Sequence, residues 1–298
     1  MSVENRKNRY ALVTGGTSGI GYELARLLAK DGYNLILVAR SNERLQEVSD
    51  EFAQAGVEVV SIDKDLFDVD SAKEVYQEIK AKGLPVEVLV NNAGQGQKGK
   101  FHEVPVERHL DIVQLNIVSL LTLTRLFLDD MVAKSSGKIL NLASVVSKTP
   151  APEFSVYAAS KAFVLSFSEA LAKELENTGV TVTALLPGRT DTAFFEQADM
   201  TETKEYQDHS LADPAQVAKD GYEAMMSGES RVISGVQNKL MVGMMNTMPD
   251  SVNAANMQKN MQPSQKDIDE RKQRPNHAAS NEERERIEES EKITKEQL

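Results

Sequence analysis

Residues 10–21 read Tyr10-Ala11-Leu12-Val13-Thr14-Gly15-Gly16-Thr17-Ser18-Gly19-Ile20-Gly21, and this stretch decides the fold. The apolar run at its start predicts a buried strand, and an amphipathic helical pattern begins directly after it at Tyr22. Between the two, the glycines follow a G-x-x-x-G-x-G spacing. Glycine allows a tight turn and lets the backbone approach a pyrophosphate at a helix N-terminus. A plain glycine turn explains the loop taken alone, but its place between a strand and a helix favours a nucleotide-binding loop.

Short β-branched runs alternate with longer helical patterns up to about residue 240. Strands are predicted at residues 10–14, 34–39, 57–62, 86–91, 138–142, 180–185 and 231–234. Helices are predicted near residues 19–30, 43–55, 70–82, 106–133, 154–177 and 214–227. Apolar runs without strict alternation are typical of parallel strands that are buried on both faces. The pattern predicts an α/β fold with a Rossmann-type, doubly wound parallel sheet of about seven strands.

The composition is that of a globular, acidic protein. Hydrophobic residues make up 41% of the 298 residues, which is enough for a core, and the formal net charge is -11. That charge argues against nucleic-acid binding through a basic surface. The chain has no cysteine, which excludes disulfides, thiolate metal sites and a cysteine nucleophile. Its four histidines show no metal-ligand spacing, so no metal is expected.

We expect a single catalytic domain over residues 8–240, a Met-rich extension over 241–261 and a charged, flexible tail over 262–298. The tail is almost wholly polar, so it cannot bury enough apolar area to offset its ordering entropy. The methionine stretch at 242–248 is expected to pack on its own domain, with a membrane or a neighbouring subunit as alternatives. No signal peptide or spanning segment of roughly 20 apolar residues is visible, so a soluble, cytoplasmic protein is expected.

A second pattern indicates a catalytic site, and it is formed by Ser144, Tyr157 and Lys161. Tyr157 and Lys161 are four residues apart, which places both on one face of a helix. We expect the ammonium to lower the Tyr157 pKa from its usual value of about 10, so that the phenol exchanges a proton near neutral pH. The spacing alone is weak evidence, because Tyr76 and Lys80 share it without a serine at the matching distance. We interpret that second pair as the solvated face of a helix.

The end of the second predicted strand bears on the choice of cofactor. NAD sites of this kind usually place an acid here, where it binds the ribose hydroxyls. In this chain Ala39 is followed by Arg40, whose guanidinium suits the 2′-phosphate of NADP. A surface arginine is the alternative, and Glu43 is an acid close by. We predict NADP, as NADPH, in preference to NAD.

Over about residues 8–240 these motifs resemble the classical short-chain dehydrogenase/reductase family. The family's four catalytic positions correspond to Asn116, Ser144, Tyr157 and Lys161. The resemblance implies an oxidoreductase that interconverts a carbonyl and a secondary alcohol by hydride transfer. In that scheme Tyr157 is the general acid/base, Ser144 binds the carbonyl oxygen, and Asn116 holds a water that links Lys161 to solvent.

The resemblance also implies a cofactor site. Its positions are Gly15, Thr17, Ser18, Gly19, Ile20, Gly21, Arg40, Asp65, Leu66, Asn92, Ala93, Gly94, Tyr157, Lys161, Pro187, Gly188, Thr190 and Thr192. Asp65 is expected at the adenine ring and Lys161 at the nicotinamide ribose. Asn91-Asn92-Ala93-Gly94 matches the family motif that ends the fourth strand. Pro187-Gly188 and Thr192 match the loop that meets the nicotinamide carboxamide.

Two other functions fit part of the pattern. A nucleotide-sugar epimerase or dehydratase also uses Tyr-x-x-x-Lys, but the glycine spacing and the short region after the sixth strand count against it. A non-catalytic NAD(P)-binding sensor or scaffold on the same fold usually lacks a catalytic residue, and this chain lacks none. The oxidoreductase is therefore the leading prediction.

The substrate pocket and the partners are predicted from the residues around the site and from the family. The residues expected to line or cover the pocket are Gln95, Gln97, Val145, Val146, Phe154 and the segment 189–211. Within that segment Phe194, Phe195 and Met200 suggest an apolar lid. Arg189 is expected on the surface, with contact to an anionic substrate as the alternative. We expect a small, fairly apolar carbonyl or alcohol substrate, no nucleic-acid partner, and a homodimer or homotetramer.

Overall fold

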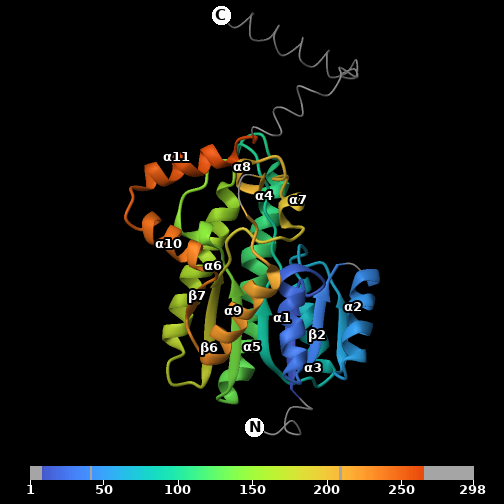
Figure 1. Cartoon of the computed structure of the whole chain (residues 1–298). Helices are drawn as coiled ribbons and strands as arrows, with labels where there is room; N and C mark the ends of the chain where they lie inside the picture. The colour runs from blue at the N-terminus through green and yellow to red at the C-terminus, as the bar shows by residue number, and fades with distance from the viewer. Residues whose placement is uncertain (1–8, 41, 208–209, 265–298) are drawn as a thin grey trace, which may run out of the picture. The chain divides into compact units, whose positions relative to one another are not determined.

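The computed structural model describes residues 9–264 except 41 and 208–209. The described residues up to Gln262 form one compact unit, the first of the chain's two, and it carries the fold (Figure 1). The charged tail predicted at 262–298 lies almost wholly outside the described residues.

The first unit is built on seven strands. They are β1 (Tyr10–Thr14), β2 (Asn34–Ala39), β3 (Val59–Asp63), β4 (Val86–Asn91), β5 (Gly137–Leu142), β6 (Val180–Leu186) and β7 (Arg231–Ile233). All neighbours are parallel, in the order β3-β2-β1-β4-β5-β6-β7. The predicted doubly wound parallel sheet is confirmed, and strand bounds differ from the predicted ones by two residues at most.

Helices cover both faces of the sheet. They are α1 (Gly19–Lys30), α2 (Asn42–Gln54), α3 (Ser71–Ala81), α4 (Val106–Val113), α5 (Leu120–Ala133), α6 (Ser155–Glu174), α7 (Phe194–Gln197), α8 (Lys204–Gln207), α9 (Pro214–Ser227), α10 (Val236–Met245) and α11 (Asp250–Met261). Helices α1, α2 and α9 pack on one face, and α3, α5 and α6 on the other. Figure 1 shows α7, α8, α10 and α11 on the side of the sheet where the strands end.

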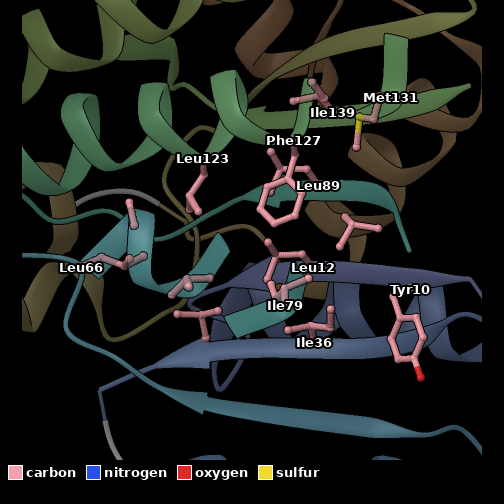
Figure 2. Packing of buried hydrophobic residues seen from close by; sticks show 14 of the residues in the cluster. Tyr10, Leu12, Ile36, Leu66, Ile79, Leu89, Leu123, Phe127, Met131 and Ile139 are labelled. Atoms are coloured by element: carbon pink, nitrogen blue, oxygen red, sulfur yellow. The ribbon is translucent and has the colours of Figure 1, made fainter. Parts of the chain in front are cut away.

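Successive side chains of a strand point to opposite faces of the sheet, and they therefore pack into two separate hydrophobic clusters. In β1, Leu12 packs in the same cluster as Phe127 of α5, and Val13 packs with Leu24 of α1 on the opposite face. Figure 2 shows the first of these clusters, with Leu12 and Phe127 among its fully buried side chains. Burying each such side chain contributes about 1.5–3 kcal/mol, so packing on both faces holds the sheet in place.

The helix predicted at 106–133 is present but has an irregular centre. Between α4 and α5 the chain forms a π-helical turn, η2 (Gln114–Ser119), with no break in the helical path. Turns of this kind occur frequently at functional sites because they re-aim side chains. The one here contains Asn116, which is buried.

The stretch Val106–Ala133 is long and apolar enough to cross a membrane, judged by length and composition alone. Core helices of soluble proteins pass the same test. Leu123, Phe127 and Met131 of this stretch are buried against the sheet. The stretch is therefore weak evidence for a membrane span.

The C-terminal part of the unit differs from the prediction. The sequence pattern fades after about residue 240 and predicts a Met-rich extension there, whereas the structure forms α10 and α11 joined by a short turn. Packing explains the difference. Met257 and Met261 of α11 are buried with Phe195 of α7, so the helix is stabilised by contacts that lie far away in the sequence.

Candidate active site

The site forms where the strand order reverses, at the carboxyl ends of β1 and β4, the usual position of ligands in such sheets. Thr14 ends β1, and its Oγ1 accepts hydrogen bonds from the backbone N–H of Asn92 (3.1 Å) and Ala93 (3.0 Å). The Asn92 Nδ2 donates to the backbone oxygens of Thr14 and Gly15, both at 2.9 Å. These four bonds hold the glycine loop against the end of β4.

Close packing explains the glycines of the loop. A Cβ atom at Gly21 would lie 2.2 Å from the Gly15 oxygen and 2.3 Å from Asn92 Nδ2, so a side chain has no room there. Gly15 and Gly19 have φ angles of 65° and 54°, which favour glycine. Ser18 is the N-cap residue of α1, but its side chain makes no capping hydrogen bond. The start of α1 thus suits a phosphate group.

Arg40 and Asp65, the residues predicted for the adenosine end of the cofactor, follow β2 and β3. The Arg40 guanidinium lies 4.8 Å from the centroid of the Phe67 ring, which orients it beside the end of β2. The Asp65 Oδ1 accepts a hydrogen bond of 3.0 Å from the backbone N–H of Phe67. Both line the same cavity as the glycine loop.

Tyr157 and Lys161 lie in the first two turns of α6 and are buried. The Lys161 Nζ donates to the Leu142 backbone oxygen at 2.7 Å and lies 5.7 Å from the centroid of the Tyr157 ring. Ser144 follows β5 and begins a short 3₁₀ helix, η3 (Val145–Lys148). The hydroxyl of the nearby Ser147 donates to the Ser144 backbone oxygen at 2.5 Å.

Aromatic rings enclose the Tyr157 phenol. The Phe154 ring centroid lies 4.5 Å from that of Tyr157, and the Phe194 centroid lies 5.1 Å away. Burial among these rings raises the pKa of Tyr157, while a hydrogen bond with Ser144 acts in the opposite direction. Burial lowers the pKa of Lys161 to about 8.

The prediction that Lys161 lowers the Tyr157 pKa is therefore wrong for the protein alone. Loss of hydration destabilises the phenolate, and the Lys161 ammonium is bound to a carbonyl oxygen instead of to the phenol. As a result Tyr157 carries its proton at neutral pH.

Asn116 lies behind the two titratable groups. Its Nδ2 donates to the Gln95 oxygen and to Ser160 Oγ, and its Oδ1 accepts from the Gln95 N–H, all at 2.9 Å. Ser160 in turn donates to the Tyr157 backbone oxygen at 2.7 Å. Asn116 thus joins η2, the segment after β4 and α6. It is a fixed group in the wall of the site.

Burial of Lys161 predicts a pH dependence of stability. The Lys161 pKa is 10.5 without burial and about 8 in the folded protein, so between these values the unfolded chain binds more protons. We therefore expect Lys161 to make the free energy of unfolding rise with pH in this window, by about 3 kcal/mol in total. Urea unfolding of the wild type and of Lys161→Met at several pH values measures this difference.

The exposed Lys239→Met serves as the control and is expected to keep the wild-type slope. The raised pKa values of Tyr10 and Tyr22 contribute equally to all three proteins, so their effect cancels in the differences. Equal slopes for the wild type and Lys161→Met between pH 8 and 10 would contradict the burial argument.

One continuous cavity of about 620 Å³ connects these parts. All the predicted site residues line it except Gly21 and Asn116. Gly21 lies beneath the glycine loop, and Asn116 is 1% exposed behind Lys161. The structure therefore brings the predicted catalytic and cofactor positions together around a single space.

Several pocket predictions need correction. Val145, Val146 and Phe154 line the cavity as predicted, and so do Phe194, Phe195 and Met200. The predicted Gln95 and Gln97 do not, since their side chains accept hydrogen bonds from Arg108 at 3.0 and 3.3 Å. Arg189 is not a surface residue, because it lines the cavity and pairs with Glu205 at 3.0 Å.

The Tyr76–Lys80 pair lies outside the cavity lining, on α3. Tyr76 is half-buried with its ring edge against Phe127, at a centroid distance of 5.0 Å, so it is not solvated as predicted. Lys80 pairs with Asp130 at 2.9 Å. The pair is a structural contact between α3 and α5.

The sequence prediction missed the C-terminal residues of the cavity. The missed lining residues on and between α10 and α11 are Met241, Met244, Met245, Met248, Asn253, Asn256, Met257, Asn260 and Met261. The methionines recur at spacings of three and four, which is a helical signal. Among the described residues, no three His, Cys, Asp or Glu side chains gather as a metal site.

The chain is similar in sequence and structure to known proteins. Residues 9–203 match the family model "short chain dehydrogenase". The very-long-chain 3-oxoacyl-CoA reductase of Rattus norvegicus is 39% identical over 192 residues, which cover 61% of this chain and 59% of that protein. The chain thus spans about three fifths of the length of the rat protein.

Two further proteins are similar to this chain, one in sequence and one in structure. The putative ketoacyl reductase of Streptomyces coelicolor is 38% identical over 184 residues, which cover 61% of this chain and 70% of that protein. The solved structure of a short-chain dehydrogenase from Sphingobium yanoikuyae in complex with NADPH is 27% identical, with a TM-score of 0.71. That match covers 82% of this chain and 97% of the other.

Proposed function

Because the chain belongs to the short-chain dehydrogenase/reductase family of oxidoreductases, we propose that it is an NADP-dependent enzyme that interconverts a carbonyl compound and its secondary alcohol. One observation carries the proposal. Ser144, Tyr157 and Lys161 meet in a cavity whose other end is the glycine loop at the start of α1. A proton donor and a nucleotide cradle in one space are what hydride transfer to a carbonyl requires.

The residues present fit a nicotinamide dinucleotide. The glycine loop leaves no room for side chains, and the N-terminus of α1 lacks a side-chain cap. In our proposal Gly15 to Ile20 hold the pyrophosphate, Asp65 and Arg40 hold the adenosine end, and Pro187 to Thr192 hold the nicotinamide. When bound, the reduced nicotinamide supplies the hydride.

Tyr157 is the proposed proton donor. Because burial raises its pKa, it carries a proton at neutral pH, which is the form that reduction of a carbonyl needs. The Ser144 hydroxyl donates a second hydrogen bond to the carbonyl oxygen as negative charge develops there. The aromatic rings around Tyr157 exclude water, which strengthens both interactions.

Lys161 and Asn116 support the proton transfer in this proposal. The Lys161 ammonium, with its pKa near 8, is charged at neutral pH and stabilises the phenolate that remains after Tyr157 has given up its proton. Asn116 fixes the Gln95 backbone beside α6, and we propose that this arrangement holds a water between Lys161 and solvent. That water would return a proton to the site.

We expect Arg40→Asp to weaken NADPH binding by roughly thirtyfold, since a hydrogen-bonded contact with a charged group is worth about 2 kcal/mol. NADH binding is expected to change little or to strengthen, because the new carboxylate suits the ribose hydroxyls. Titration of wild type and variant with each cofactor, followed by nicotinamide fluorescence, measures both affinities.

Arg26→Asp is the matched control. Arg26 lies on α1, pairs with Glu23 and does not line the cavity, so both affinities should stay at the wild-type values. A wild-type preference for NADH would overturn the NADP assignment and leave the oxidoreductase standing. Binding of neither cofactor would overturn the oxidoreductase proposal and the NAD(P)-binding alternative alike.

We also propose a cytoplasmic homodimer or homotetramer. The support is an exposed apolar surface on α4 and α5, where Val106, Leu110 and Leu121 are 60%, 61% and 41% exposed. Large exposed apolar side chains of this kind are common where subunits associate. Light scattering after size exclusion measures the mass in solution, and a monomer at all concentrations would contradict the proposal.

A further inference from the structure

The substrate end of the cavity has an unusual lining. Six methionines from α10, α11 and the turn between them form a methionine wall (Met241, Met244, Met245, Met248, Met257 and Met261). We propose that this wall binds long, flexible, uncharged aliphatic carbonyl compounds, and that the Arg189–Glu205 pair disfavours anionic ones. The inference rests on the proposed reductase function and names its substrate class.

The apolar lining begins at the proton donor. Tyr157, Met257 and Met261 belong to one buried hydrophobic cluster, together with Phe154 and Phe195. A carbonyl group placed at Tyr157 therefore has its carbon chain directed along apolar side chains. Against these apolar side chains a polar chain would lose its hydration.

The chemistry of methionine suits a flexible chain. Its unbranched side chain has three rotatable bonds and fills irregular gaps, so a wall of methionines adapts to different chain conformations. Met244 and Met248 are 56% and 42% exposed, which means that the wall continues to the protein surface. A long chain therefore meets no closed end.

The position of the wall is fixed by hydrogen bonds. The buried Asn253 of α11 donates from Nδ2 to the Met245 backbone oxygen at 2.9 Å, which joins α11 to the end of α10. The Lys204 N–H donates to the Gln262 oxygen at 3.0 Å and attaches the end of α11 to α8. The wall is therefore held in place by hydrogen bonds within the protein.

Charge at this end of the cavity is already balanced. Apart from Lys161 and the residues at the nucleotide end, Arg189 is the only cationic side chain among the described residues that line the cavity. Its Nη1 donates to Glu205 Oε1 at 3.0 Å, and Glu205 Oε2 accepts from Asn260 Nδ2 at 3.1 Å. The Arg189 and Glu205 side chains are only 21% and 14% exposed. An anionic substrate would face a carboxylate with no free cation to offset it.

The first test uses the full-length protein with NADPH and linear methyl ketones from butanone to dodecanone. We expect kcat/KM to rise roughly three- to fourfold for each added methylene that the wall covers. A flat profile with efficient reduction of butanone would overturn the inference and leave the reductase function intact.

The second test compares Met257→Gln with Leu240→Gln. Met257 is buried in the wall, whereas Leu240 is 65% exposed on α10 and does not line the cavity. We expect Met257→Gln to lower kcat/KM for dodecanone about tenfold more than it lowers kcat/KM for butanone. Leu240→Gln should behave like the wild type with both. An equal loss on both ketones in Met257→Gln would overturn the role of the wall.

A binding measurement keeps the inference testable without turnover. Nile red, a neutral apolar dye, is expected to bind the wild type and to be displaced by dodecanone, and Met257→Gln should bind both more weakly. If no ketone is reduced, the proposed function fails, and dye displacement still decides whether the wall binds long chains. No displacement in a folded wild type would overturn the inference.

Variants at Glu205 and Glu196 test the role of charge at this end of the cavity. The wild type is expected to prefer dodecanone to the ω-carboxylate of the same chain length. Glu205→Gln frees Arg189 and should raise kcat/KM for the keto acid by about tenfold or more. Glu196→Gln removes the same charge from an exposed position outside the lining and should have no effect. An unchanged preference in Glu205→Gln would contradict the role of the pair.

Discussion

Tyr157→Phe is expected to lower kcat for carbonyl reduction by about a thousandfold, because the proposed proton donor is lost. The phenylalanine ring keeps the contacts with Phe154 and Phe194, so the fold and the cavity should be preserved. The rate of NADPH oxidation with a saturating ketone measures the loss. Nicotinamide fluorescence should show an NADPH affinity close to that of the wild type.

Tyr206→Phe is the matched control for this change. Tyr206 packs in the same aromatic cluster, with its ring 5.1 Å from Phe195, but it does not line the cavity. Its kcat should stay within about twofold of the wild-type value. A Tyr157→Phe enzyme that keeps a tenth or more of the wild-type kcat would contradict the role of Tyr157 as general acid.

Gly21→Ala is expected to weaken NADPH binding by at least roughly thirtyfold and to lower the Tm. The added Cβ would lie 2.2 Å from the Gly15 oxygen and 2.3 Å from Asn92 Nδ2, so the glycine loop must move away from α1. Overpacking of this kind costs about 1–3 kcal/mol, and here the displaced atoms are those that shape the cofactor cradle. Fluorescence titration and thermal unfolding measure the two effects.

Gly243→Ala is a control that is expected to raise stability, where Gly21→Ala lowers it. Gly243 lies within α10, and no atom lies within 4 Å of the position that its Cβ would take. The change should raise stability by about 1 kcal/mol through helix propensity and leave NADPH binding unchanged. Wild-type NADPH affinity in Gly21→Ala would show that the loop does not hold the cofactor.

Local patterns predicted the sheet and much of the site. The strands could be recognised because parallel strands buried on both faces are continuous apolar runs, and Tyr10–Thr14 and Asn34–Ala39 were predicted to the residue. The glycine loop could be recognised because a backbone that must pass close to other atoms excludes side chains. Tyr157 and Lys161 could be paired because helix geometry fixes their spacing.

Burial was not predictable from these patterns. The spacing of Tyr157 and Lys161 suggested that the ammonium lowers the phenol pKa, yet burial raises it. The difference depends on burial, to which Phe194 contributes from a distant part of the chain and Phe154 from the N-cap of the same helix. Likewise Arg189 was expected on the surface, since its pairing with Glu205 requires α8 to be in place.

By itself, the sequence determined the parallel sheet, the glycine loop and the Tyr157–Lys161 pair, because each of these depends on residues that are near neighbours along the chain. Only the tertiary structure decided that α10 and α11 bring the methionine wall to the same cavity as Tyr157. Helix α11 packs against α7 and α8, and α10 against η3, all of which lie far away in the sequence. Long-range packing of this kind leaves little trace in local residue patterns, and it is this packing that shapes the substrate end of the site.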